Sequence, residues 1–93
     1  MTNSSRADRL VEIVVQEREA GCPMADEALI PVALRRWDSF ERRCKKPERA
    51  TLEDRAHDLL KCFVSQYPKQ NYDMACLEHL AQAFASILNK AGE

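Results

Sequence analysis

The sequence predicts an all-α protein, a small antiparallel bundle of four main helices within a single domain of residues 1–93. Apolar residues recur at spacings of three and four in four separate stretches, which is the helical period. The chain has two glycines and few valines and isoleucines, which argues against a sheet built on tight turns. Connections of roughly four to nine residues separate the stretches, as is usual between helices of a bundle.

The composition excludes several other classes of protein. With 45% hydrophobic and 31% charged residues, the chain is neither disordered nor membrane-spanning by composition. No apolar run approaches the ~18 residues of a membrane span, and the polar start of the chain is unlike a signal peptide. We therefore expect a cytoplasmic protein with a flexible segment at 1–4.

The last stretch, 73–91, has the widest apolar surface and opens with Asp73 as its N-cap. Its stripe, at helical spacing, consists of Leu77, Leu80, Ala81, Phe84 and Leu88, widened by Cys76, Ala83, Ala85 and Ile87. A helix of this kind needs apolar neighbours on more than one side. It lies centrally in the bundle, or it shares its face with a second copy or a partner.

Capping signals delimit the other helices. Ser5-x-x-Asp8 begins a helix over 5–20 with Gly21 just after its end, and Thr51-x-x-Asp54 begins another that stops before Pro68. The run at 10–15 is rich in β-branched residues, so a strand competes there. A third helix covers 31–45. The segment 22–30 is ambiguous, and 24–30 forms either a turn or a short extra helix.

The wide apolar faces of the first and last helices suggest a homodimer, because a bundle of 93 residues has too small a core to bury both faces fully. The residues expected at that interface are Leu10, Ile13, Val14, Leu80, Phe84, Ile87 and Leu88.

The most distinctive charge pattern lies in the basic segment 35–49, which has seven positive and three negative residues in a chain of net charge −1. This cluster is a solvated helix face, a surface for an acidic protein, or a nucleic-acid site. Trp37 is a core anchor, or part of its indole stays exposed with Arg36 or Phe40 beside it as a binding hot spot. The candidate partner-binding residues are Arg35, Arg36, Trp37, Phe40, Arg42 and Arg43.

The nucleic-acid alternative would use Arg35, Arg42, Arg43 and Lys46. Two features of the sequence argue against this alternative. The chain lacks a basic tail, and the connection that follows the basic segment is unlike the short glycine-containing turn of a helix-turn-helix. The aromatic residues of the segment fall on its apolar seam, where they are not placed to stack on bases.

Cysteine and histidine do not form a convincing reactive or metal site. We expect Cys22, Cys44, Cys62 and Cys76 to be reduced, mostly buried thiols, with disulfides as the alternative. Cys76-x-x-His79 could offer two metal ligands, but His57 and Cys62 diverge by ~140° on their own helix and cannot complete a tetrahedral zinc site. We expect no metal, no cofactor and no enzymatic activity.

In size and build the chain resembles the small all-helical anti-activators and adaptors of bacteria, a likeness of architecture alone. The function expected from the sequence is that of a regulatory or inhibitory module, a homodimer that binds and sequesters another protein, such as a bacterial transcription regulator, through helical surfaces.

Overall fold

The computed structural model describes residues 5–44 and 49–91, and these form an all-α bundle with four α-helices and no strand. The helices are α1 (Arg6–Glu19), α2 (Leu29–Arg43), α3 (Leu52–Val64) and α4 (Met74–Ala91), with a short 3-10 helix, η2 (Lys69–Asn71), before α4. The predicted fold class is therefore confirmed. The segment 1–4, predicted to be flexible, and the candidate nucleic-acid contact Lys46 lie outside the described ranges.

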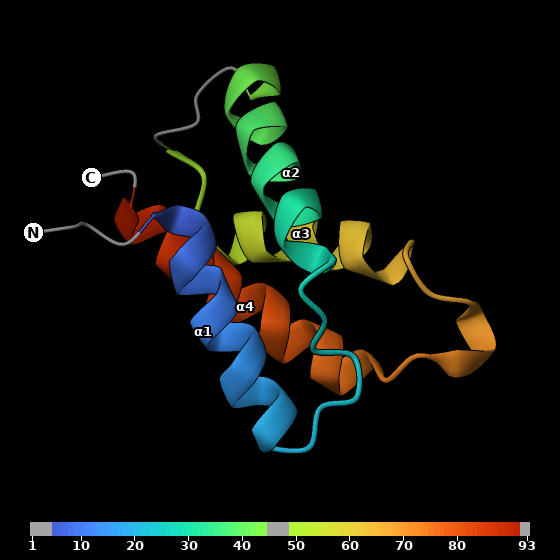
Figure 1. The fold of residues 1–93 in the computed structure, drawn as a ribbon. Helices are drawn as coiled ribbons and strands as arrows, with labels where there is room; N and C mark the ends of the chain where they lie inside the picture. The colour runs from blue at the N-terminus through green and yellow to red at the C-terminus, as the bar shows by residue number, and fades with distance from the viewer. Residues whose placement is uncertain (1–4, 45–48, 92–93) are drawn as a thin grey trace, which may run out of the picture.

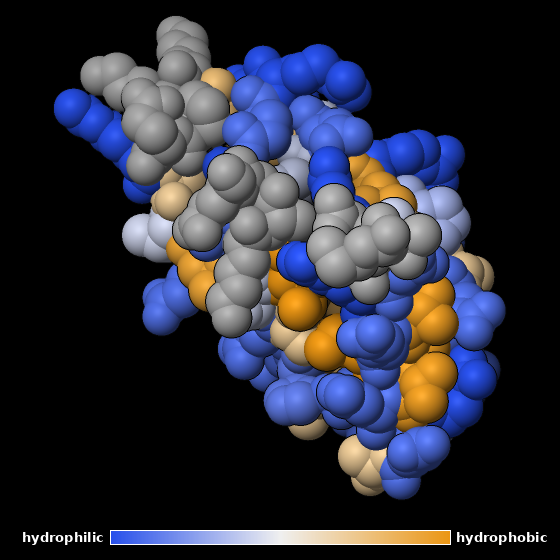
Figure 2. Space-filling model, turned by 60° about the vertical axis from the view of Figure 1, so that its left-hand side comes forward, coloured by the Kyte–Doolittle hydropathy of each residue, from blue (hydrophilic) through white to orange (hydrophobic). Residues whose placement is uncertain are grey.

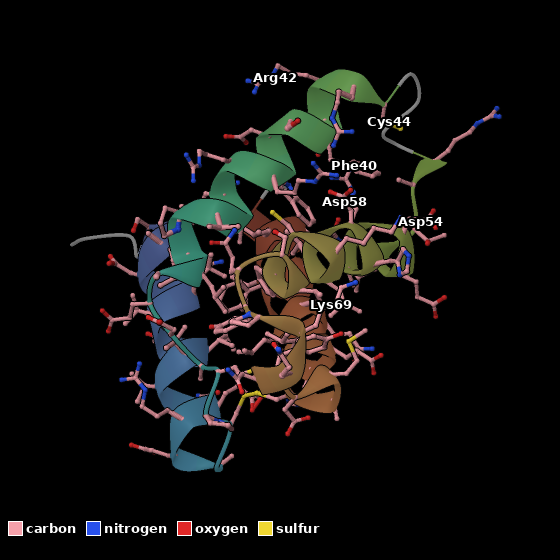
Figure 3. The ribbon with its side chains drawn as sticks, turned by 90° about the vertical axis from the view of Figure 1, so that its right-hand side faces the viewer. Phe40, Arg42, Cys44, Asp54, Asp58 and Lys69 are labelled. Carbon is pink, nitrogen blue, oxygen red and sulfur yellow. A yellow bond between two sulfur atoms is a disulfide. The ribbon has the colours of Figure 1, made fainter. Side chains whose placement is uncertain are left out.

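Helix α4 lies at the centre of the bundle. It packs against both α1 and α3, while α2 packs mainly on α3 (Figure 1). The C-terminal half of α2 rises beyond the other helices in this view and again after a quarter turn (Figures 1 and 3). The wide apolar face of α4 is thus covered by two neighbours of its own chain, which is the first of the two arrangements that the sequence allowed.

The predicted caps begin three of the helices. The hydroxyl oxygens of Ser5 and Thr51 accept the backbone N–H groups of Asp8 and Asp54, and each aspartate accepts the cap residue's own N–H in return. Asp73 accepts the N–H of Cys76 at 3.2 Å through its side chain and so caps α4. These bonds satisfy N–H groups that the first turn of a helix otherwise leaves without a partner.

Helix α1 ends at the predicted glycine in a Schellman motif. Gly21 has φ +101°, and its N–H donates to the carbonyl of Arg18, while the N–H of Cys22 donates to the carbonyl of Glu17. This pattern of paired bonds ends the helix. It fixes the point from which the α1–α2 connection departs.

The short extra helix proposed for 24–30 does not form. Residues 22–28 are turns and irregular backbone, and Leu29 and Ile30 already belong to α2. Pro31 therefore lies in the first turn of α2, where its missing N–H leaves no helical bond unmade. The helix ends at Arg43 rather than Lys45, because Cys44 adopts an extended conformation with ψ 128°.

Most residues expected at a dimer interface lie inside the core of the single chain. Five of them are fully or almost fully buried: Leu10, Val14, Leu80, Phe84 and Leu88. Ile13 and Ile87 are only half-buried, and Val15 is 40% exposed. On the side of the molecule that carries α1 and the chain ends, hydrophobic surface is visible in several places between hydrophilic side chains (Figure 2). The homodimer stays a prediction, with the half-buried residues as its remaining contacts.

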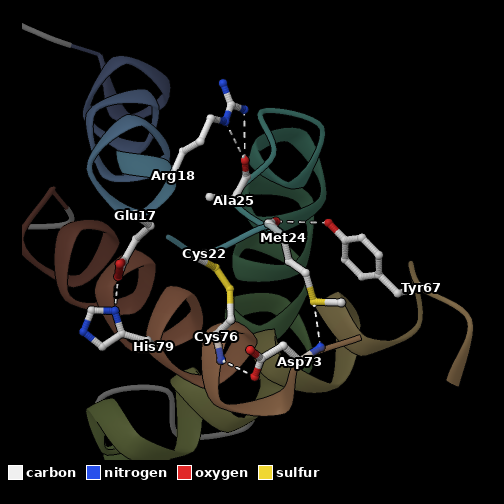
Figure 4. The surroundings of a disulfide bond; sticks show 9 residues. All are labelled: Glu17, Arg18, Cys22, Met24, Ala25, Tyr67, Asp73, Cys76 and His79. Atoms are coloured by element: carbon white, nitrogen blue, oxygen red, sulfur yellow. Dashed lines mark hydrogen bonds and ion pairs between the residues drawn. A yellow bond between two sulfur atoms is a disulfide. The ribbon is translucent and has the colours of Figure 1, made fainter. Parts of the chain in front are cut away.

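A disulfide joins Cys22 to Cys76, which corrects the expectation of four reduced thiols. Their Cα atoms lie 5.7 Å apart because the Schellman motif places Cys22 beside the first turn of α4, where Cys76 lies (Figure 4). Cys44 and Cys62 are unpaired, as expected, but they are half-buried rather than buried.

Three further contacts hold the α1–α2 connection near this disulfide (Figure 4). The hydroxyl of Tyr67 donates to the carbonyl of Met24 at 3.1 Å, and the N–H of Asp73 donates to the Met24 sulfur at 3.0 Å. The guanidinium of Arg18 donates to the carbonyl of Ala25 through two nitrogens. The disulfide is thus one of several ties between this connection and the rest of the bundle.

Candidate protein-interaction surfaces

The basic segment of α2 is attached to α3 by an ion pair. Arg36 Nε and Nη2 lie 2.8 Å from the two carboxylate oxygens of Asp58, a bidentate arrangement that adds directionality to the charge attraction. The hydrogen bond to Asp58 raises the pKa of Arg36 above its ordinary value. Arg36, a predicted partner-binding residue, therefore joins two helices of the same chain.

A second cation, Arg55 of α3, packs against two aromatic side chains of α2. Its guanidinium carbon lies 4.6 Å from the centre of the Trp37 ring and 5.0 Å from that of Phe40, within cation–π range. Its Nη1 lies 2.7 Å from Oε1 of Glu41. Arg55 is 7% exposed and Trp37 is 6% exposed, so Trp37 is a core anchor and not an exposed hot spot.

The remaining arginines of α2 form a separate surface, here called the outer face, made of Arg35, Arg42 and Arg43. All three are exposed. Arg35 and Arg42 are seven residues apart and so lie above one another on the helix. Figure 3 shows Arg42 pointing away from the bundle and Phe40 on the side that faces α3.

The outer face lacks carboxylate partners among the residues that the structure describes. The two acidic residues of α2 are engaged elsewhere, because Asp38 pairs with Arg6 at 3.7 Å and Glu41 pairs with Arg55. Arg43 donates a hydrogen bond to the hydroxyl of Ser39. The outer face therefore concentrates three positive charges on the projecting helix of a chain whose net charge is −1.

An open groove of about 520 Å³ lies between α3 and α4. Helix α3 lines it with Leu52, Glu53, Ala56, His57 and Leu60, and α4 lines it with Glu78, Ala81 and Gln82. Each helix contributes one alanine to its lining, Ala56 or Ala81, and one exposed carboxylate to its rim, Glu53 or Glu78. We call it the α3–α4 groove.

The candidate pair of Cys76 and His79 does not form in the structure. Cys76 is in the disulfide, and Nδ1 of His79 contacts the carboxylate of Glu17 instead. In the described part of the chain, no three histidine, cysteine, aspartate or glutamate side chains are grouped as metal ligands would be.

Sequence reasoning missed Arg55 and the α3–α4 groove. Arg55 lies at the edge of the apolar stripe of its helix, three residues after Leu52 and four before Leu59, and that placement is the signal for a cation whose stem packs on the core. The groove gives a weaker signal, because alanines on an apolar face are usually core residues.

Among the described helices, none combines the length and the apolar character needed to cross a membrane. Comparison of the chain with known proteins finds no match to a family model, a curated protein or a solved structure.

Proposed function

We propose that the protein is a protein-interaction module that binds an acidic surface of another protein through the outer face of α2. The observation that carries the proposal is the separation of the arginines into two sets. Arg36 and Arg55 pair with carboxylates and hold α2 on α3, whereas Arg35, Arg42 and Arg43 are exposed without a described carboxylate partner.

The chemistry of the outer face is compatible with a carboxylate-rich partner, and the net charge of −1 argues against a general binder of phosphate backbones. Guanidinium groups bind carboxylates in a planar, two-point geometry, and exposed complementary charges speed association and select partners. The Arg36–Asp58 and Arg55–Glu41 ion pairs support a binding role for the outer face, because they hold α2 in place on α3. A regulatory protein that sequesters its target needs such a preorganised surface.

The test is a pull-down from cell extract, with and without nuclease, using the full chain as bait. The wild type is compared with Arg42→Glu combined with Arg43→Glu. The matched control is Lys61→Glu combined with Lys69→Glu, which reverses two exposed cations outside α2. We expect protein retained after nuclease treatment by the wild type and the control, and lost with the α2 variant.

The nucleic-acid alternative is measured in parallel with a duplex DNA probe. Binding to phosphates falls steeply with salt, because it depends on the release of counterions. Tight duplex binding that disappears in the Arg42→Glu and Arg43→Glu variant, together with loss of all captured protein on nuclease treatment, would replace the proposed function by this alternative.

Self-association is a separate part of the proposal. A homodimer is supported by the partial exposure of Ile13, Ile87 and Val15, and sedimentation equilibrium of the pure protein tests it. The cytoplasmic location expected from the sequence is weakened by the Cys22–Cys76 disulfide, because stable disulfides are rare where thiols are kept reduced.

A further inference from the structure

We infer that the α3–α4 groove is a second docking site, whose occupant is a cationic amphipathic helix of a partner protein. The occupant places one large apolar side chain in the hollow and lysine or arginine residues beside the rim. This surface is distinct from the outer face of α2 and has the opposite charge.

The floor of the groove is shaped to receive a side chain. Ala56 and Ala81 are 7% and 1% exposed, and they lie where α3 and α4 pack together. A larger side chain at either position would occupy part of the space that these two alanines line. The volume of about 520 Å³ accommodates a leucine, methionine or phenylalanine of another molecule with room for its flanks.

The walls of the groove are apolar on the side of α3. Leu52 is 42% exposed, a large value for a leucine in the first turn of a packed helix, and Leu60 is only half-buried. An apolar side chain seated on Ala56 would contact both leucines and remove their surface from water. The groove therefore offers the partner an apolar contact and not only a charged one.

The rim determines the charge of the occupant. Glu53 of α3 and Glu78 of α4 are both exposed, and they stand on opposite sides of the hollow. On a helix, residues three or four positions from an anchoring side chain lie on the same face, one turn away. Lysine or arginine at those positions of the partner would reach both carboxylates, whereas an acidic helix would be repelled.

The groove is independent of the α2 surface. Glu53 and Asp58 are five residues apart on α3, so their side chains diverge by ~140° around the helix axis. Asp58 holds Arg36 of α2, whereas Glu53 faces the groove. Binding in the groove therefore leaves the contacts between α2 and α3 in place.

The probe for this site is a fluorescein-labelled amphipathic helical peptide of leucine and lysine, with a matched peptide that has glutamate in place of lysine. Fluorescence anisotropy measures the Kd of each for the full chain. We expect the cationic peptide to bind and the acidic one not to bind. We expect chemical-shift changes in ¹H–¹⁵N spectra at Ala56, His57 and Gln82.

Two variants test the two features of the groove. Ala56→Leu fills the hollow, and Glu53→Gln with Glu78→Gln removes the rim charge; each is expected to weaken binding by about tenfold or more. The charge variant changes only exposed side chains, so it remains informative if Ala56→Leu does not fold. The control, Glu12→Gln with Glu27→Gln, removes two exposed carboxylates elsewhere and is expected to leave the Kd unchanged.

Three results would overturn the inference: no binding of the cationic peptide, binding that both groove variants leave unaltered, or shift changes confined to α2. The Arg42→Glu and Arg43→Glu variant separates this inference from the proposed function, because it is expected to bind the cationic peptide as the wild type does.

Discussion

The guanidinium carbon of Arg55 lies 4.6 Å from the centre of the Trp37 ring, so a cation from α3 covers the indole that α2 contributes to the core. The contact explains how an arginine can be 7% exposed in so small a bundle. Its charge is balanced by Glu41, and its flat surface rests on aromatic rings. This contact and the Arg36–Asp58 pair together hold α2 on α3.

Replacing Arg55 with alanine is expected to lower the free energy of unfolding by about 2 kcal/mol, because both the cation–π contacts and the stem packing are lost. Arg55→Lys is expected to recover only part of this, since an ammonium lacks the planar surface that rests on the rings. Urea unfolding followed by Trp37 fluorescence measures both. The control is Lys61→Ala, at an exposed position of the same helix, which is expected to change the free energy of unfolding little. A change for Arg55→Ala as small as that of the control would contradict the prediction.

Reduction of the Cys22–Cys76 disulfide is expected to destabilise the fold by about 2–4 kcal/mol, because the bond closes a loop with a sequence separation of 54 and so restricts the unfolded chain. Thermal unfolding with and without a thiol reductant measures this effect. Cys22→Ser with Cys76→Ser is expected to unfold as the reduced wild type does. Cys44→Ser with Cys62→Ser serves as the control and is expected to keep the full response to reductant.

The stability of the protein is expected to decrease at alkaline pH through Tyr67. Burial, and to a lesser degree the negative charge of Asp26, raises the pKa of Tyr67 above its ordinary value of about 10. Below about pH 10 the tyrosine is protonated in both states, and its contribution is fully present. Above that pH the unfolded chain ionises first, so the contribution is lost as the pH rises towards the folded pKa.

Urea unfolding between about pH 8 and pH 11 tests the alkaline prediction. Tyr67→Phe is expected to have a shallower decrease in this range. It should also be less stable at neutral pH by about 0.5–1.5 kcal/mol, because the hydrogen bond to the Met24 carbonyl is lost. Equal pH slopes for the variant and the wild type would show that Tyr67 is not the titrating group.

Substitution of Gly21 by alanine is expected to cost about 1 kcal/mol of folding free energy, and the cost arises in the backbone alone. Its φ of +101° is unfavourable for residues with a Cβ, yet an added Cβ would meet no atom within 4 Å. Gly21→Asn should be less harmful, since asparagine tolerates positive φ better. Chemical denaturation of the two variants gives the comparison, and an unchanged stability for Gly21→Ala would exclude backbone strain at this turn.

The features that the sequence predicted well depend on neighbours within one helical turn. A hydroxyl or carboxylate at a helix start bonds N–H groups two or three residues ahead, so Ser5, Thr51 and Asp73 could be identified without the fold. Gly21 belongs to the same group, since the end of a helix specifies its own backbone conformation.

The features that were missed depend on residues far apart in the chain. The pairing of Cys22 with Cys76 follows from the packing of α1 on α4, which no local pattern specifies. The division of the α2 arginines into paired and exposed ones likewise follows from how α2 packs on α3. Arg36 and Arg42 look alike in the sequence, but only Arg36 lies opposite a carboxylate of α3.

The disulfide also divides the chain topologically. Residues 22–76 form a covalent ring that contains all of α2 and α3, whereas α1 and most of α4 lie outside it. A protease that cuts once between α2 and α3 would therefore nick the molecule without separating its pieces. Such a product migrates as one band on a non-reducing gel and as two bands after reduction.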